Sequence, residues 1–259
     1  MQFIKYIILF YSFSSVAQIP VTAKFINKEE LKAELIIDID NFNSEYHIYN
    51  NTLSIQKNNK THNYSNIQLG EITSVNTYNS LKINVFYKNF NSVVILDNRL
   101  TEIVNINFNT LQPFRDITNV STGYDNTIWI FNQNTQQLEL FDYITNKTKT
   151  KTLPVNSNII DMYSNYNYCW LLTGSFIYAY NYIGSLIYKL PNNGYTSLKV
   201  NHGNLYLLKK NQLFFKAKST SEIQEIKLPK LLIKQFFVTN ETLYIYDGEF
   251  LYHYQLITN

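Results

Sequence analysis

Ile128-Trp129-Ile130-Phe131 aligns without gaps with three later stretches: Cys169-Trp170-Leu171-Leu172, Leu205-Tyr206-Leu207-Leu208 and Leu243-Tyr244-Ile245-Tyr246. All four have a large aromatic residue in the second position. Polar turn residues precede each stretch, and a second apolar run follows it, such as Leu138-Glu139-Leu140-Phe141. Two apolar runs separated by turn residues are typical of a β-hairpin, so this pattern predicts a hairpin that recurs along the chain.

The aromatic column of these stretches recurs every 36 to 41 residues. Four short strands with their turns, which make one blade of a β-propeller, have about this length. Helical solenoids share the period, but alternation with a period of two, as at Glu139 between Leu138 and Leu140, favours strands. Three units also end alike, in a short strand that runs into a proline: Thr152-Leu153-Pro154, Lys189-Leu190-Pro191 and Lys227-Leu228-Pro229.

The front half of the chain fits the same template. Residues 35–39, 46–49, 53–55 and 61–64 give one four-strand unit, and residues 81–86, 93–96 and 102–106 belong to another. The prediction is an all-β propeller of about six four-stranded blades, although counts of five or seven also fit. The last unit has about three strands, and Val21 to Ile26 is a β-like segment without a partner. Their pairing would close the ring, with Lys28 to Lys32 as a loop or one helical turn.

Length, charge and cysteine content limit the class of protein. A chain of 259 residues can bury its core as one domain, which we assign to residues 18–259. The formal net charge of +3 is spread along the chain, so neither a nucleic-acid footprint nor a polybasic membrane patch is expected. Cys169 is the only cysteine, which excludes an internal disulfide and a zinc site with two or more thiolates. Its apolar neighbours predict a small buried hydrophobic residue.

Residues 1–17 have the pattern of a cleavable secretory signal peptide. Lys5 is followed by an apolar run from Tyr6 to Phe13 and then by the small-residue pattern Ser15-Val16-Ala17. The alternative is a buried N-terminal strand. A transmembrane anchor is disfavoured because the apolar run is shorter than the roughly 20 residues that span a bilayer. We therefore expect an exported protein, with the periplasm as its compartment.

The sequence contains no motif that carries chemistry. A glycine-rich phosphate loop, a hydrolase elbow, a His-Glu-x-x-His pair and an aspartate-rich calcium loop are all absent from it. The prediction is therefore that the protein is not an enzyme and has no catalytic, cofactor-binding or metal-binding residues. Of the four histidines, His47 and His253 lie in strand patterns with their side chains expected on the solvent face, and His62 and His202 resemble turn residues.

Some of the carboxylates could form a glycosidase pair, because two acids about 5 to 10 Å apart can hydrolyse a glycoside. A ring of strands could bring Asp38 and Asp40 near Asp97 or Asp161 in a central channel. The stronger interpretation is structural for Asp97 and for two similar residues, Asp125 and Asp247, because aspartate in a turn accepts hydrogen bonds from its own backbone. Catalysis by these acids is therefore disfavoured.

Two stretches carry a family resemblance: Leu81-Lys82-Ile83-Asn84-Val85-Phe86-Tyr87 and Lys230-Leu231-Leu232-Ile233-Lys234-Gln235-Phe236-Phe237. Together with the leader and the degenerate repeats, they resemble a flavobacterial (Bacteroidetes) family of exported β-propellers. The resemblance covers nearly the whole mature chain. It implies a propeller with a location in the cell envelope, and it brings no catalytic residues with it. Association with the outer membrane through a partner is an alternative to residence in the periplasm alone.

Two classes of function remain. The favoured one is a non-enzymatic interaction module, in which a rigid ring presents loops and aromatic side chains to a protein partner during envelope assembly, secretion or transport. The alternative is a carbohydrate-active or small-ligand propeller with its site at the mouth of the channel. Converging carboxylates in a pocket would favour the alternative, and a channel filled with apolar side chains would weaken it.

Overall fold

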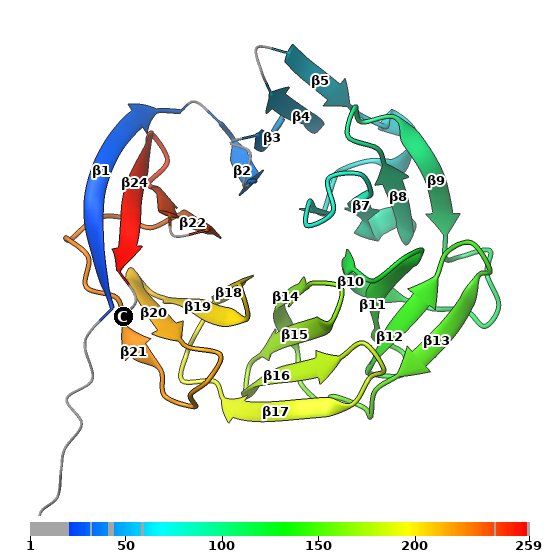
Figure 1. Ribbon diagram of the computed structural model, residues 1–259. Helices are drawn as coiled ribbons and strands as arrows, with labels where there is room; N and C mark the ends of the chain where they lie inside the picture. The colour runs from blue at the N-terminus through cyan, green and yellow to red at the C-terminus, as the bar shows by residue number, and fades with distance from the viewer. Residues whose placement is uncertain (1–20, 32, 41–43, 58–59, 241, 258–259) are drawn as a thin grey trace, which may run out of the picture.

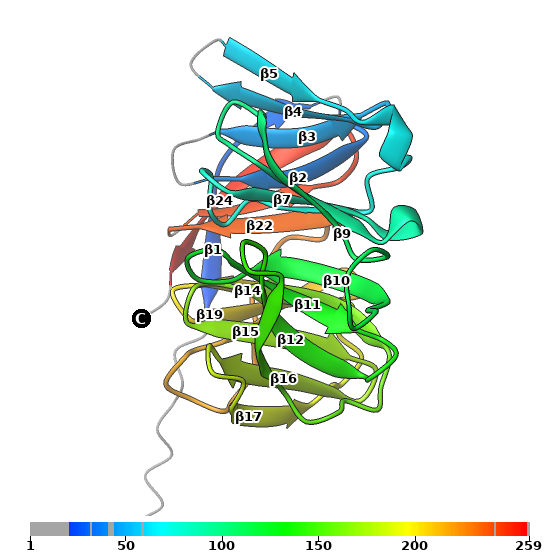
Figure 2. The same cartoon turned by 90° about the vertical axis from the view of Figure 1, so that its right-hand side faces the viewer.

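The protein is a six-bladed β-propeller in this computed structural model, which describes residues 21–31, 33–40, 44–57, 60–240 and 242–257. Each blade is an antiparallel sheet of four strands, and the blades follow one another around a central axis (Figure 1). Figure 2 shows the ring from the side, with the strands running between its two faces. The all-β fold and the favoured blade number are therefore confirmed.

The strands take equivalent places in the six blades. The innermost strands are β2 (Leu35–Ile39), β6 (Ser74–Asn76), β10 (Ile117–Thr122), β14 (Ile159–Ser164), β18 (Ser197–Asn201) and β22 (Gln235–Thr239). The second strands are β3 (Glu45–Tyr49), β7 (Ile83–Tyr87), β11 (Thr127–Asn132), β15 (Tyr168–Thr173), β19 (Asn204–Lys209) and β23 (Thr242–Tyr246). We number the blades 1 to 6 in this order.

The outer half of each blade completes the sheet. The third strands are β4 (Thr52–Lys57), β8 (Ser92–Leu96), β12 (Gln137–Asp142), β16 (Phe176–Asn181), β20 (Gln212–Lys216) and β24 (Phe250–Ile257). The outermost strands are β5 (Lys60–Tyr64), β9 (Glu102–Asn107), β13 (Lys147–Lys151), β17 (Leu186–Pro191), β21 (Gln224–Glu225) and β1 (Thr22–Glu30). Two short 3-10 helices, η1 (Ile67–Leu69) and η2 (Lys88–Phe90), lie in connections.

The N-terminal strand closes the ring, as expected. β1 pairs antiparallel with β24 and so becomes the outermost strand of blade 6, with Thr22 opposite Ile257 (Figure 1). The prediction of a loop or helical turn that begins at Lys28 is wrong. Lys28 and Glu30 still belong to β1, where Lys28 lies opposite Tyr252 and Glu30 lies opposite Phe250. The sequence interpretation ended the strand too early because charged residues follow its apolar part. This strand is the outermost of its blade, and its side chains are largely exposed.

The aromatic column of the repeat packs between blades. Trp129 belongs to the apolar cluster between blades 3 and 4, Trp170 to that between blades 4 and 5, and Tyr206 to that between blades 5 and 6. Strands such as β7, β8 and β11 are buried along their whole length because neighbouring blades cover both faces. This explains why the middle strands are continuous apolar runs, and the apolar burial between blades stabilises the ring.

The proline endings were only partly predicted. Pro191 is the last residue of β17, where it lies opposite Phe176. Thr152 to Pro154 instead follow the end of β13, and Lys227 forms only an isolated bridge with Thr22. A proline follows the last strand segment of blades 3 and 5 and ends the last strand of blade 4. Proline has no N–H to donate, so the strand pairing does not continue beyond it.

Blade 3 contains a buried ion pair. Glu139 on β12 is fully buried, and its Oε2 accepts Arg115 Nε at 3.1 Å and Thr148 Oγ1 at 2.6 Å. Asn132 Nδ2 donates to the other oxygen at 3.0 Å. Burial raises the pKa of a carboxyl group, but these hydrogen bonds hold the pKa of Glu139 below its ordinary value. The pair joins β12 to the connection that precedes β10.

Candidate functional site

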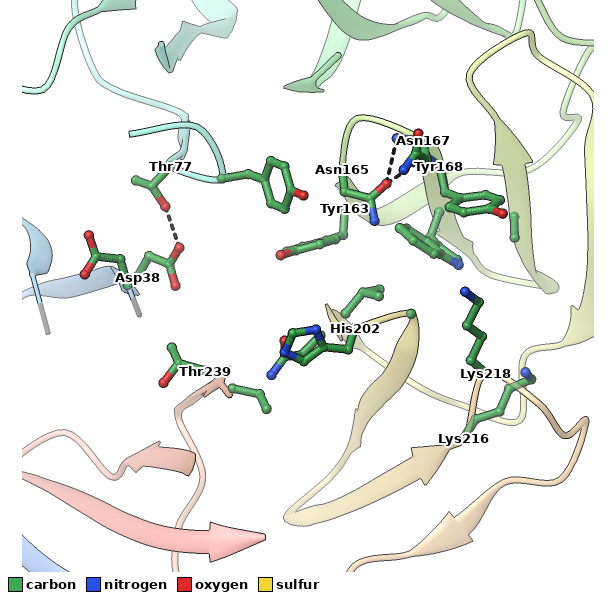
Figure 3. A pocket seen from close by; sticks show the side chains of 18 of the residues that line it. Asp38, Thr77, Tyr163, Asn165, Asn167, Tyr168, His202, Lys216, Lys218 and Thr239 are labelled. Atoms are coloured by element: carbon green, nitrogen blue, oxygen red, sulfur yellow. Dashed lines mark hydrogen bonds between the residues drawn. The ribbon is translucent and has the colours of Figure 1, made fainter. Parts of the chain in front are cut away.

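A cavity of about 540 Å³ opens at the end of the central channel. It lies on the face that carries the turns from the innermost to the second strand of each blade, which include Tyr78, Tyr124, Tyr166 and His202. We call this the mouth face. Figure 3 shows side chains from several blades converging on the cavity. Its size is that of a typical small-molecule site.

An aromatic wall formed by blade 4 borders the cavity. Trp170 is buried behind Tyr168 and Tyr163, with ring centroids 5.6 Å and 6.4 Å away. The indole Nε1 donates a hydrogen bond of 2.9 Å to the hydroxyl of Tyr188. Burial raises the pKa of Tyr188 to about 12, so this hydroxyl stays protonated at neutral pH. The hydrogen bond holds Tyr188 in place and leaves the wall rigid and uncharged.

Two lysines of blade 5 line one end of the cavity. Lys216 is the last residue of β20 and is only 4% exposed, whereas Lys218 in the following turn is exposed. Lys216 Nζ donates to the carbonyl of Ala217 at 3.1 Å and lies 4.9 Å from the centre of the Tyr188 ring. Burial lowers the pKa of Lys216 because the charged form loses hydration.

The opposite side of the cavity is acidic. Asp38 and Thr77 lie across from the two lysines (Figure 3), and Asp38 accepts hydrogen bonds from the Thr77 hydroxyl and from the Ile39 amide. Burial raises the pKa of Asp38, an effect that Lys199 opposes. Asp40 also borders the cavity. The site is therefore bipolar, with cations and carboxylates separated by the aromatic wall.

The central channel continues from the cavity and has a volume of about 280 Å³. Residues of all six innermost strands line it, and they include both Asp38 and Asp161. Asp161 accepts hydrogen bonds from Ser197 Oγ at 3.0 Å and from the amide of Leu198 at 2.8 Å. The channel carboxylates thus bind the neighbouring blade, and the channel lining includes both apolar residues such as Met162 and polar residues such as Gln235.

The other acids considered from the sequence lie elsewhere. Asp97 in the turn after β8 accepts the amides of Arg99 and Thr101, both at 2.8 Å, and is not among the channel residues. Asp247 accepts the amides of two residues in its own turn, and Asp125 has a φ of 51° in the turn before β11. The turn positions of all three residues are confirmed, and Asp97 and Asp247 accept backbone amides there as expected.

The histidines do not come together. His202 lines the cavity from the turn after β18, as expected of a turn residue. The prediction that His62 is also a turn residue is wrong, because His62 lies within β5. His47 and His253 lie in strands, both partly exposed, and His253 contacts Glu29 at 3.0 Å. Cys169 is buried, as predicted. Within the described ranges, no cluster of three or more His, Cys, Asp or Glu side chains could hold a metal ion.

Sequence reasoning singled out few of the cavity residues. Asp38, Asp40 and His202 were named, but Lys216, Lys218 and the tyrosines of the wall were not. Lys216 follows the apolar run Leu213-Phe214-Phe215, where a lysine resembles the polar end of any strand. Only its burial distinguishes it, and burial depends on the neighbouring blade.

Solved structures with similar folds are propellers. The chain resembles virginiamycin B lyase from Staphylococcus aureus with a TM-score of 0.60 and 13% identity, over 89% of this chain and 99% of that chain. The WD40 domain of Neurospora crassa Pan2 gives a TM-score of 0.59 at 10% identity, over 83% of this chain and 73% of that chain. Kluyveromyces lactis Hsv2 gives a TM-score of 0.52 at 12% identity over 66% of this chain. The match spans only 54% of the Hsv2 chain.

These likenesses place the chain in the class of β-propeller proteins and establish the fold alone, because the identities are low. No family model matches the sequence, and no curated protein matches it either. Among the helices of the described segments, none has the length and apolar character needed to cross a membrane. The predicted signal peptide, residues 1–17, lies outside the described residues.

Proposed function

We propose that the protein is an exported, non-enzymatic interaction module of the bacterial cell envelope, which binds a protein partner through its mouth face. The observation that carries this proposal is a set of two aromatic pairs, in which Tyr78, Tyr166 and Tyr182 are exposed and Tyr124 is half-buried. Tyr78 of blade 2 contacts Tyr166 of blade 4 with ring centroids 5.1 Å apart. Tyr124 of blade 3 contacts Tyr182 of blade 4 at 5.8 Å. The pairs link the turns of three blades into one surface.

Exposed aliphatic side chains extend this surface. Leu81, Ile144 and Ile183 lie in turns of the same face and are each more than half exposed. Single exposed apolar residues are common, but aromatic and aliphatic groups gathered on one face are typical of protein interfaces. The channel carboxylates Asp38 and Asp161 are engaged in hydrogen bonds between blades, which favours a non-enzymatic role. Export is supported by the leader pattern of residues 1–17.

The test is purification of the tagged, exported protein from its native envelope, followed by identification of stoichiometric partners. The double variant Tyr166→Ser/Tyr182→Ser should lose the partner while it keeps its fold. Leu153→Ser is the matched control, because Leu153 is an exposed apolar residue in a turn of the opposite face. Recovery of the protein alone, together with a glycosidase or lyase activity, would overturn the proposal.

A second candidate function is the binding of a small ligand at the mouth of the channel. The cavity with its buried Lys216 favours it, since a preformed hollow with a few polar groups is typical of ligand sites. The two functions use the same face and share Tyr78, which borders the cavity, but Tyr166 and Tyr182 do not line the cavity. Substitutions of Tyr166 and Tyr182 therefore test the first function, and substitutions inside the cavity, such as that of Lys216, test the second.

A further inference from the structure

In the described part of the chain, the buried Lys216 has no acidic partner. The other buried base among the described residues, Arg115, is paired with Glu139 at 3.1 Å. For Lys216, the protein partners in the described part of the chain are one carbonyl oxygen and the face of Tyr188. A lysine ammonium has three N–H donors, and burying a charge is costly unless it is paired. The ammonium group of Lys216 therefore lacks a counter-charge, and Lys216 borders a cavity that could hold one.

The aromatic wall defines the body of the molecule that would fit. Tyr163, Tyr168 and Tyr188 are partly exposed, so their rings are accessible from the cavity. Aromatic faces carry partial negative charge and attract the polarised C–H groups of a sugar ring. A purely apolar ligand would leave the polar atoms around the cavity without partners, which is unfavourable.

Neutral polar groups surround this wall. Asn165 and Asn167 lie beside it in the turn after β14, and Thr239 lies near His202 on the far side (Figure 3). Amide and hydroxyl groups both donate and accept hydrogen bonds, as sugar hydroxyls require. An extended peptide would instead bind most readily along a free strand edge. The cavity is lined mainly by side chains at strand ends and turns, so it favours a compact ring over a peptide.

We propose that this cavity binds a carboxylated sugar, a uronic acid, with its carboxylate at Lys216 and its ring against Tyr168 and Tyr188. The inference rests on the second function proposed above, ligand binding at the channel mouth. The carboxylate supplies the missing counter-charge, and Lys218 adds a second cation at the same end (Figure 3). Asp38 and Asp40 at the other end disfavour a ligand with a second negative charge there.

The test is a titration followed by saturation-transfer NMR, with galacturonate as the probe. Galactose is the neutral control, since it differs from galacturonate in lacking the carboxylate. We expect Lys216→Met to weaken galacturonate binding roughly tenfold or more. This variant should fold, because methionine fills a similar volume without a buried charge. Lys234→Met is the matched control, since Lys234 is exposed near the turn at Gly248 on the opposite face.

The possible results distinguish a failure of the uronic acid inference from a failure of the proposed ligand-binding function. Galacturonate binding that Lys216→Met weakens and Lys234→Met leaves unchanged supports the inference. Equal binding of galactose and galacturonate, or binding of an acidic tetrapeptide in place of galacturonate, overturns the uronic acid but keeps ligand binding. Absence of a signal from every sugar and peptide in the folded protein overturns both the inference and the ligand-binding function.

Discussion

Asp161 on β14 accepts the backbone N–H of Leu198 on β18 at 2.8 Å, and this bond joins blade 4 to blade 5 at the wall of the channel. The same carboxylate oxygen accepts the Ser197 hydroxyl at 3.0 Å. Asp38 makes the corresponding contact from blade 1 to Thr77. Both aspartates directly follow an irregularity in the pairing of their strand. A carboxylate that resembles a catalytic group in the sequence is thus a link between blades.

Removal of this link should destabilise the ring. We expect Asp161→Ala to lower the free energy of unfolding by about 1.5 to 3 kcal/mol, because the Leu198 amide loses a charged acceptor. Asp161→Asn keeps a carbonyl acceptor of the same shape and should cost less. Urea unfolding followed by tryptophan fluorescence measures both variants. Equal stability of Asp161→Ala and the wild type would show that the contact contributes nothing.

The Arg115–Glu139 pair predicts a loss of stability in acid. The pKa of folded Glu139 lies below its ordinary value of 4.5, so between these two values the unfolded chain binds a proton that the native state does not. The stabilising contribution is complete above pH 4.5 and is lost as the pH falls through the folded pKa. Urea unfolding from about pH 3 to pH 7 should show this loss, and Glu139→Gln should reduce it.

Two further variants sharpen this test. Arg115→Met removes the nearer of the two cations that contact Glu139 and leaves Lys151, 3.6 Å from the other carboxylate oxygen. We expect a cost of about 3 kcal/mol at neutral pH, the lower end for a broken buried pair. Glu225→Gln is the control, because Glu225 is an exposed residue of β21. If the acid dependence is the same in Glu139→Gln as in the wild type, other carboxylates cause it.

Closure of the ring by β1 makes the N-terminal segment essential for a monomeric fold. A chain that begins at Leu31 loses the partner of β24 and exposes a strand edge together with the apolar cluster that contains Val21. We expect a loss of several kcal/mol of stability and association that increases with concentration. Size-exclusion chromatography with light scattering and thermal unfolding measure these effects. A chain that begins at Gln18 is the control and should remain monomeric.

Cys169 should be unreactive in the folded protein. Burial raises the pKa of its thiol well above the ordinary value, so little thiolate forms and reagents cannot reach it. We expect alkylation by iodoacetamide at pH 8 to be at least about a hundredfold slower in buffer than in denaturant. Mass spectrometry of the intact protein measures the extent. Rapid modification of the native protein would contradict the assignment of Cys169 to the core.

The ends of strands were harder to predict than the strands themselves. The middle strands were visible in the sequence because each is packed on both faces, as at Trp129 and Trp170. The innermost strands β10, β14 and β18 were not singled out, since polar channel residues interrupt their apolar pattern and two of them contain an irregular residue. In β1, Lys28 and Glu30 continue an exposed outermost strand, where charged residues are tolerated.

The repeat, the class of fold and the closing strand were determined by the sequence alone, because the burial of middle strands on both faces imposes a local pattern of apolar and aromatic residues. The cavity was decided only by the tertiary structure. Lys216 and Asp38 are 178 positions apart in the chain, and closure of the ring brings both to the same mouth. Lys216 is buried partly by Tyr188 of the neighbouring blade. The sequence around Lys216 does not show which residues of another blade will cover it.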